Sequence, residues 1–309
     1  MSDVVLLFSG QGAQKVGMGK DFHAASVRAR ELFGQADATL GMPLSSVMFE
    51  GPDPELTRTS RCQPALYLHG LVALELLREK VPTLNPVAAA GLSLGEFTAH
   101  AAAGTFSMAD GLQLVARRGQ FMEEACESTR GAMAALVGGD EEAVKSLAAE
   151  CDVDVANFNA PGQIVISGGV DGIDAAVEKA KDRGIRRAVK LNVAGAYHSR
   201  LMQSAQDQLA TELAGVAMVS PALPVVCNFG ASVVSDPTEI RSMLERQVTG
   251  SVRWTESIQL LLDRGHRTFV ELGPGKVLAG LMGRISKEAT VHSVEDLESL
   301  EAAAAALGG

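Results

Sequence analysis

The sequence feature that most constrains the fold is a Gly-x-Ser-x-Gly motif at residues 91–95, which directly follows the apolar run of residues 87–90. It predicts a short strand that ends in a tight turn, with Ser93 at the start of a helix. Gly91 and Gly95 have no Cβ, so the strand and the helix can approach each other closely around the serine. The first amides of the helix then point toward the hydroxyl and can stabilise an oxyanion. Such a short motif also arises by chance, so the rest of the chain must support it.

Length and composition limit the class of protein. With 309 residues, of which 47% are hydrophobic, the chain is long enough for one large domain and a smaller one. Its 27 basic and 37 acidic residues give a net charge of −10, which argues against a general nucleic-acid surface. We expect neither a secretion signal nor a membrane span. The four cysteines lack metal-ligand spacing, so we expect no metal and a reducing cytoplasmic location: Cys62, Cys126, Cys151 and Cys227.

A glycine-rich loop follows the first predicted strand. Residues 4–8 form a continuous apolar run, typical of a buried parallel strand, and Gly10-Gln11-Gly12 comes after it. A dinucleotide fingerprint requires a third glycine where Lys15 stands, so nucleotide binding is not predicted. Open α/β sheets place their sites at the carboxyl ends of strands. We therefore expect the free amides of this loop to face the same oxygen as the turn at Ser93.

A helix predicted over residues 108–124 contains an arginine on its apolar face. Arg118 falls within a stripe of apolar residues at helical spacing, whereas Arg117 falls on the polar face. The stripe consists of Gly111, Leu114, Val115 and Met122. An inward guanidinium needs an acidic partner. That partner is either an internal carboxylate, as a structural ion pair, or the carboxylate of a ligand.

Residues 131–193 have the element order βαββαβ, which is the ferredoxin-like pattern. The predicted elements are strand 132–137, helix 141–150 with Asp140 as its cap, strand 153–158, strand 164–167, a helix that ends at Gly184, and strand 188–193. The sequence therefore predicts a subdomain inserted into a larger α/β domain.

His198 is the best-placed candidate for a general base among the six histidines. We expect the segment from Gly195 to open a helix with His198 on its inward face, one turn before Met202. A position near a helix amino terminus favours the neutral imidazole that a base requires. The alternative is a core histidine with its hydrogen bonds satisfied.

Three further segments give weaker predictions. Gln63-Pro64 suggests a helix start with proline at the first position. Gly273-Pro274-Gly275-Lys276 is not a phosphate-binding loop, because Val277 stands where Ser or Thr would bind magnesium. The alanine-rich tail at residues 298–309 is expected to fray.

Taken together, eight motifs come in the order and spacing of a known family. The chain resembles the malonyl-CoA:acyl carrier protein transacylases over about residues 4–286. The resemblance implies an α/β fold, with a hydrolase-like parallel-sheet domain (1–128 and 196–309) and an inserted ferredoxin-like subdomain (129–195). The motifs are Gly10-Gln11-Gly12-Ala13-Gln14, residues 59–66, Gly91-Leu92-Ser93-Leu94-Gly95-Glu96, Arg118-Gly119-Gln120-Phe121-Met122, residues 157–163, Gly195-Ala196-Tyr197-His198, Gln247, and Glu271-Leu272-Gly273-Pro274-Gly275.

The resemblance implies a ping-pong acyl transfer through a malonyl-serine ester. Ser93 is the expected nucleophile, and His198 is the base, oriented by the main-chain carbonyl of Gln247. The amides of Gln11 and Leu94 are expected to form the oxyanion hole. Arg118 would hold the malonyl carboxylate, which gives the inward arginine a ligand as its partner. The expected cleft-lining residues are Gln63, Asn157, Asn159 and Gln247.

Two positions depart from the family pattern. Leu92 stands where many relatives have histidine, which suggests a modified acyl pocket. Tyr197 replaces the commoner phenylalanine and adds a hydroxyl near the acyl group. The Gly-Ala-Tyr-His motif is closer to the pattern for malonyl than to that for methylmalonyl.

The expected substrates are malonyl-CoA and the phosphopantetheine thiol of an acyl carrier protein, with no other cofactor and no membrane or nucleic-acid partner. We expect a monomer that supplies fatty-acid synthesis; polyketide and malonate decarboxylase systems are alternatives. A serine hydrolase or thioesterase, and a non-catalytic carrier-binding scaffold, remain competing hypotheses. The candidate docking surface for the acidic carrier is the densest basic run of the sequence, which consists of Arg183, Arg186, Arg187 and Lys190. Lys276 is a further candidate.

Overall fold

Strand β1 (Asp3–Phe8) lies inside a six-stranded sheet in the computed structural model, which describes residues 3–308. The strand order is β10-β9-β1-β2-β7-β8, and every pairing is parallel except β7 with β8. Val4 and Leu6 enter one apolar core and Val5 and Leu7 another, so β1 is apolar throughout because both faces are covered. The other strands are β2 (Asn85–Gly91), β7 (Val225–Cys227), β8 (Ser232–Val233), β9 (Thr268–Leu272) and β10 (Thr290–Val294).

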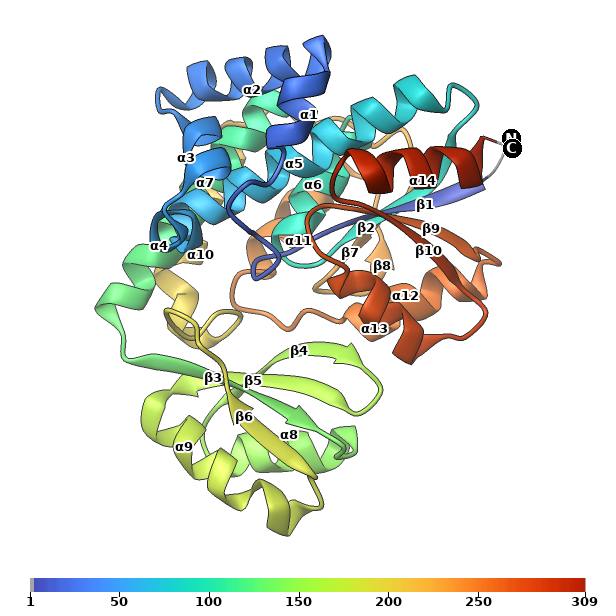
Figure 1. Cartoon of the computed structure of the whole chain (residues 1–309). Coiled ribbons are helices and arrows are strands. Elements are labelled where there is room, and N and C mark those ends of the chain that lie inside the picture. The colour runs from blue at the N-terminus through green and yellow to red at the C-terminus, as the bar shows by residue number, and fades with distance from the viewer. Residues whose placement is uncertain (1–2, 309) are drawn as a thin grey trace.

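Helices cover both faces of this sheet (Figure 1). Helices α12 (Trp254–Asp263) and α13 (Val277–Ile285) pack on one face, and Trp254 is fully buried there. The helices that share the core of the opposite face are α1 (Lys20–Ala25), α2 (Val27–Leu40), α3 (Leu44–Glu50), α4 (Asp53–Thr57), α5 (Thr59–Lys80), α6 (Leu94–Ala102), α7 (Met108–Ser128), α10 (Gln203–Gly215), α11 (Pro237–Arg246) and α14 (Leu297–Leu307). Within residues 3–308, no helix has both the length and the apolar character needed to cross a membrane.

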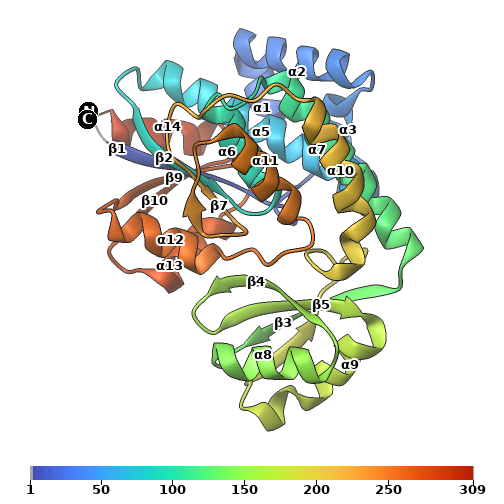
Figure 2. The same ribbon diagram turned by 180° about the vertical axis from the view of Figure 1, so that it is seen from behind.

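A second, antiparallel sheet lies apart from the first, as Figures 1 and 2 show from opposite sides. Its strand order is β4-β5-β3-β6. Most of its buried apolar residues form a separate core, whereas Met133, Ala156 and Val165 join a core of the large sheet. The elements are β3 (Gly131–Val137), α8 (Glu141–Glu150), β4 (Asp154–Ala160), β5 (Gln163–Gly169), α9 (Val170–Lys179), the short 3₁₀ helix η1 (Ala180–Arg183) and β6 (Arg187–Lys190). The predicted βαββαβ order and the predicted α/β fold class are confirmed.

Strand β4 forms main-chain hydrogen bonds with the loop that follows α11, and so ties the small sheet to the large domain. Val252, in that loop, donates its amide to Ala156 O at 2.8 Å, and Phe158 donates its amide to Val252 O at 2.9 Å. Two main-chain hydrogen bonds therefore fix this loop against the edge of the small sheet, only five residues after Gln247.

Two helix-end predictions were wrong. Helix α5 begins at Thr59, so Pro64 lies inside it; 16 of its 22 residues are buried, and this packing offsets the one main-chain hydrogen bond that proline removes. The tail does not fray before Leu307, because α14 starts with an Asp296–Ser299 capping box and buries Leu300. Position 309 lies outside the described residues.

Candidate active site

Ser93 lies between β2 and α6 with a strained backbone conformation, φ 54° and ψ −107°. The glycines on either side of it permit the turn. A Cβ on Gly91 would lie 2.0 Å from the carbonyl carbon of Gly95, and a Cβ on Gly95 would lie 2.2 Å from Phe8 O. Both distances are below any tolerable contact, so only glycine fits at these two positions. The strand, turn and helix predicted from the motif are confirmed.

His198 Nε2 lies 2.7 Å from Ser93 Oγ, and His198 Nδ1 lies 2.8 Å from the main-chain oxygen of Gln247. A carbonyl oxygen only accepts, so Nδ1 carries the proton and Nε2 is free to accept one from the serine. Burial, together with the charge of Arg118, lowers the pKa of His198 to about 4. The imidazole is therefore neutral near neutral pH, as a general base must be.

The helix predicted to start before His198 begins later. His198 lies in a turn with φ 54°, a 3₁₀ turn η2 (Arg200–Met202) follows, and α10 starts at Gln203. The side chain of Ser199 caps η2 by accepting the amide of Leu201 at 3.3 Å. The inward stripe from Met202 onward is buried as predicted.

Arg118 is 1% exposed and points toward the serine, whereas Arg117 is exposed, as the helical spacing predicted. Its Nη2 donates to Ser93 Oγ at 3.1 Å and to Gln247 Oε1 at 2.9 Å, and its Nη1 donates to Gln63 Oε1 at 2.7 Å. Its guanidinium carbon lies 5.4 Å from the centre of the Phe97 ring. Burial lowers the pKa of Arg118 to about 10, opposed by the charge of a nearby glutamate, so the group stays cationic.

No carboxylate of residues 3–308 forms an ion pair with Arg118. Its three partners are neutral oxygens, and its Nε has no partner in this part of the chain. Its direct partners therefore supply no negative charge, and the buried carboxyl group of Glu96 reaches it only through Gln247. The direct ion pair expected as an alternative is absent, and the site retains capacity for an anionic ligand.

The glycine-rich loop packs against the turn at Ser93. A Cβ on Gly10 would lie 2.5 Å from Leu92 O, and Leu92 donates its amide to Phe8 O at 3.1 Å. Within residues 3–308, the main-chain amides of Gln11 and Leu94 donate no hydrogen bond. Both amides are thus free to donate, as the predicted oxyanion hole requires.

Asn157 and Asn159 lie on β4 and form no side-chain hydrogen bond with the cluster around Ser93 in the described part of the chain. Asn157 is 8% exposed and its main chain bridges to Val252. The Oδ1 atom of Asn159 is buried without a partner among residues 3–308. The two asparagines therefore lie on the small sheet and are not part of the hydrogen-bonded centre around Ser93.

Two functional positions were missed from the sequence. Asn228 follows β7 directly; its Oδ1 accepts the amide of Ser93 at 2.6 Å, and its Nδ2 donates to Gly91 O at 2.8 Å. Glu96 is fully buried, and its Oε2 accepts from the amide of Asn228 at 3.0 Å and from Gln247 Nε2 at 2.6 Å. A polar residue directly after the short apolar run Val225–Cys227 was the available signal for Asn228.

The two departures from the family pattern have structural consequences. The hydroxyl of Tyr197 lies 2.7 Å from Thr59 Oγ1, which also accepts from Gln11 Nε2 at 3.4 Å. Thr59, on α5, thereby links Tyr197 to the glycine-rich loop. Burial raises its pKa to about 12, so the phenol stays neutral. Leu92 packs against the apolar core that α12 and α13 share with the sheet.

Glu96, His100 and Cys227 bring ligand-type atoms within 4.8 Å of one another. We assign no metal to this trio. The Oε2 atom of Glu96 is already used by Gln247 and Asn228. Burial and the charge of Glu96 raise the pKa of the Cys227 thiol far above its usual range, which opposes the thiolate that a metal would need.

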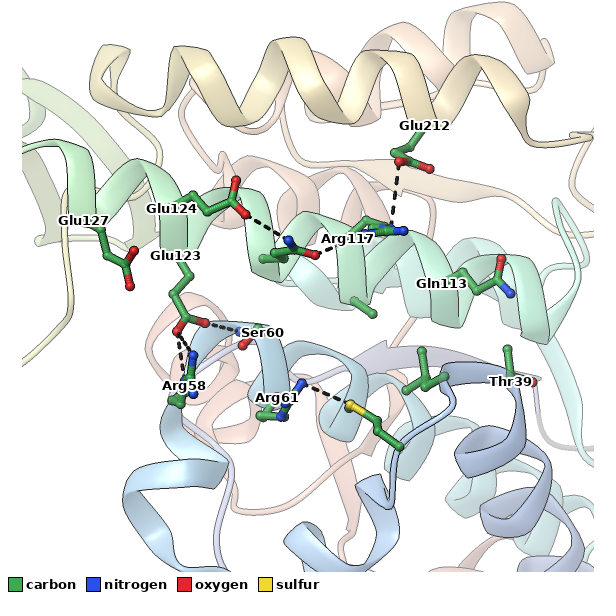
Figure 3. Close-up of a pocket in the computed structure, with 14 residues that line it drawn as sticks. Thr39, Arg58, Ser60, Arg61, Gln113, Arg117, Glu123, Glu124, Glu127 and Glu212 are labelled. Atoms are coloured by element: carbon green, nitrogen blue, oxygen red, sulfur yellow. Dashed lines mark hydrogen bonds and ion pairs between the residues drawn. The ribbon is translucent and has the colours of Figure 1, made fainter.

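A separate cavity of about 730 Å³ lies on the polar face of α7 and shares no residue with the cluster around Ser93. Figure 3 shows two ion pairs among its charged side chains: Arg58 pairs with Glu123 at 2.8 Å, and Arg117 with Glu212 at 3.9 Å. Paired surface charges of this kind carry little net field, so we place the active site at Ser93.

Comparisons with known proteins agree with this geometry. The acyl transferase domain family matches residues 5–305. A malonyl CoA-acyl carrier protein transacylase from Bacillus subtilis is 41% identical over 308 residues, which are 98% of this chain and 96% of that protein. The crystal structure of an acyl-carrier-protein-S-malonyltransferase from Bartonella henselae superposes with a TM-score of 0.94 at 39% identity and full coverage of both chains (100%). A malonyl-transacylase in complex with its type II PKS acyl-carrier protein superposes with a TM-score of 0.95 at 35% identity, covering 99% of this chain and 100% of that one.

Proposed function

The chain belongs to the malonyl-CoA:acyl carrier protein transacylase family, and on that basis we propose that it transfers a malonyl group from coenzyme A to an acyl carrier protein. The observation that carries the proposal is the position of Ser93 Oγ, which lies 2.7 Å from His198 Nε2 and 3.1 Å from Arg118 Nη2. A nucleophile placed between a neutral base and a buried cation that has no direct ion-pair partner suits a thioester whose far end is a carboxylate.

In the first half-reaction, Ser93 Oγ attacks the thioester carbonyl while its proton passes to His198 Nε2. The amides of Gln11 and Leu94 stabilise the oxyanion. The carbon–sulfur bond then breaks, the coenzyme A sulfur takes the proton from His198, and a malonyl ester remains on Ser93. The main-chain oxygen of Gln247 keeps Nδ1–H fixed throughout, which holds the tautomer that both proton transfers need.

In the second half-reaction, the phosphopantetheine thiol of the carrier gives its proton to His198 and attacks the same carbonyl. The ester bond breaks, and Ser93 regains its proton. Arg118 holds the malonyl carboxylate in both halves, with Gln63 and Gln247 orienting the guanidinium through their side-chain oxygens. Asn157 and Asn159, on β4, are proposed to line the cleft on the side of the small sheet.

Coenzyme A thioester and carrier protein are the proposed partners, with no resident cofactor, because nucleophile, base and cation are all side chains of one chain. Because one chain supplies all three groups, we also propose that the protein acts as a monomer. A cytoplasmic location is consistent with the four cysteines, all unpaired and buried. We propose that the product supplies fatty-acid synthesis. A polyketide carrier is the second candidate acceptor, favoured by the similarity to the malonyl-transacylase in complex with its type II PKS acyl-carrier protein.

The test is transfer of radiolabelled malonate from malonyl-CoA, with and without holo-carriers from fatty-acid, polyketide and malonate decarboxylase systems. We expect label on a carrier and little free malonate. Rapid release of free malonate with no labelled carrier would identify a hydrolase or thioesterase. Binding of a carrier without any label on Ser93 would identify a non-catalytic scaffold.

A further inference from the structure

Glu96 is a fully buried carboxyl group three residues after the nucleophile. Its Oε2 accepts two hydrogen bonds, from Asn228 and from Gln247, whereas its Oε1 has no partner within residues 3–308. Buried carboxylates with an unsatisfied oxygen are costly, so the residue needs a compensating charge. The steps of the proposed transfer reaction do not use this residue.

The compensating charge is Arg118, which is coupled to Glu96 through one side chain. Gln247 donates from Nε2 to Glu96 Oε2 at 2.6 Å and accepts at Oε1 from Arg118 Nη2 at 2.9 Å. The same Nε2 also donates to Ser93 O at 3.0 Å, which fixes the orientation of the amide. The free site thus contains one buried cation and one buried anion, separated by the amide of Gln247.

A malonyl carboxylate on Arg118 adds a second anion to this buried site. Two negative charges would then share one positive charge in a region of low dielectric constant, which is unfavourable for both carboxylates. We propose that Glu96 takes up a proton from solvent when the malonyl carboxylate binds Arg118, so that the site keeps one negative charge for one positive charge. This inference rests on the proposed malonyl transfer and makes Glu96 the residue that couples malonyl binding to proton uptake.

The other titratable groups around Glu96 stay neutral near neutral pH. On its own helix, burial lowers the pKa of His100 to about 3. On β7, burial raises the pKa of Cys227 far above its usual range. Before α10, the pKa of His198 is lowered to about 4 and that of Tyr197 is raised to about 12, in each case chiefly by burial. Burial raises the pKa of Glu96 to about 7, opposed by its hydrogen bonds and Arg118, so Glu96 is the group among them poised to change charge.

The proposal gives malonyl binding a pH dependence with a definite sign. Below its pKa Glu96 already carries the proton, and binding requires no uptake. Above that pKa the proton must be acquired, so the KM for malonyl-CoA rises by up to about tenfold per pH unit. In Glu96→Gln the side chain is neutral at every pH, and the KM for malonyl-CoA loses this dependence.

Proton counting tests the proposal directly. Malonyl-CoA is added to enzyme in weakly buffered solution with a pH indicator, and the ester on Ser93 is counted by intact-protein mass spectrometry. A blank of coenzyme A alone corrects for ionisation of the released thiol. At about pH 8 we expect uptake close to one proton per ester, and at about pH 6 a small fraction of that. Glu96→Gln is expected to show none at either pH, whereas Glu124→Gln, an exposed glutamate on α7, is expected to behave like wild type.

The outcomes separate the two proposals. Formation of the ester at about pH 8 without proton uptake, or equal uptake in Glu96→Gln, overturns the role of Glu96 and leaves malonyl transfer intact. Absence of the ester overturns malonyl transfer and this inference together. If Glu96→Gln does not fold, as judged by circular dichroism, the comparison of wild type at the two pH values decides the question.

Discussion

Arg118 Nη2 lies 3.1 Å from Ser93 Oγ, so the buried cation of this site contacts the nucleophile itself. A substrate that reacts at Ser93 and ends on Arg118 must therefore be short. The malonyl group meets this requirement, because one methylene separates its thioester carbonyl from its carboxylate. A long acyl chain would instead place methylenes against a buried guanidinium, which costs desolvation without a compensating charge. The spacing of these two residues thus predicts selectivity for a small, anionic acyl group.

Replacing Arg118 with alanine should separate anionic from neutral acyl donors. Loss of a buried, hydrogen-bonded charge partner costs about 2–5 kcal/mol, so kcat/KM for malonyl-CoA should fall by about 30-fold or more. Transfer from acetyl-CoA should be spared or enhanced. Arg117→Ala, on the exposed face of the same helix, is the matched control and should leave both rates near wild type. An equal loss for malonyl and acetyl donors would rule out the carboxylate role.

The loss of activity at low pH should reflect protonation of His198. Its pKa is lowered to about 4 by burial and Arg118, and only the neutral imidazole accepts the serine proton. Activity should therefore be lost as the pH falls through about 4 and be fully present between this pKa and about pH 7, above which Glu96 raises the KM. The measurement is kcat/KM for malonyl-CoA against pH, with circular dichroism at each pH to confirm the fold. A midpoint near about 6.5, the usual value for histidine, would contradict the buried neutral base.

The turn at Ser93 should not tolerate a methyl group. In Gly91→Ala the new Cβ would lie 2.0 Å from the carbonyl carbon of Gly95, so we expect a loss of about 3 kcal/mol or more in the free energy of unfolding. Gly280→Ala is the control, because α13 leaves open space there; it should gain about 0.5–1 kcal/mol from helix propensity. Urea unfolding measures both. Wild-type stability in Gly91→Ala would mean that the strand and helix are not in close contact.

Carrier docking should depend on Arg186 and Arg187, which are exposed and form no ion pair within residues 3–308. Charge reversal at both should raise the KM for the acidic carrier about tenfold and leave the KM for malonyl-CoA unchanged. Lys190→Glu should have a smaller effect, because Lys190 already pairs with Asp174 at 2.6 Å. If neither added salt nor these charge reversals change the KM for the carrier, the carrier docks elsewhere.

Local patterns predicted much of the fold. Asp140 caps α8 at Glu141, as expected, because a cap and a helical stripe are encoded by neighbouring residues. The same argument predicted the inward position of Arg118. Helix α5 differs because burial along its length outweighs the preference of Pro64 for a first position. Tertiary packing of this kind depends on distant segments, so a short stretch of sequence does not predict it.

The centre of the site was only partly predictable. Ser93 and His198 belong to motifs, and the structure brings their side chains together. The contacts of Glu96 with Asn228 and Gln247 span 132 and 151 positions of sequence, and no local pattern reports such a distance. The roles of these residues emerge only when β7 and α11 are packed against α6.

The most direct test of the account is the mass of the protein after incubation with malonyl-CoA, followed by peptide mapping. We predict one malonyl group, located on Ser93, that disappears when holo-carrier is added while malonyl-carrier accumulates. Ser93→Ala should acquire no malonyl group, although the rest of the site is unchanged. A malonyl group on another residue, or transfer to the carrier by Ser93→Ala at the wild-type rate, would contradict acylation at Ser93.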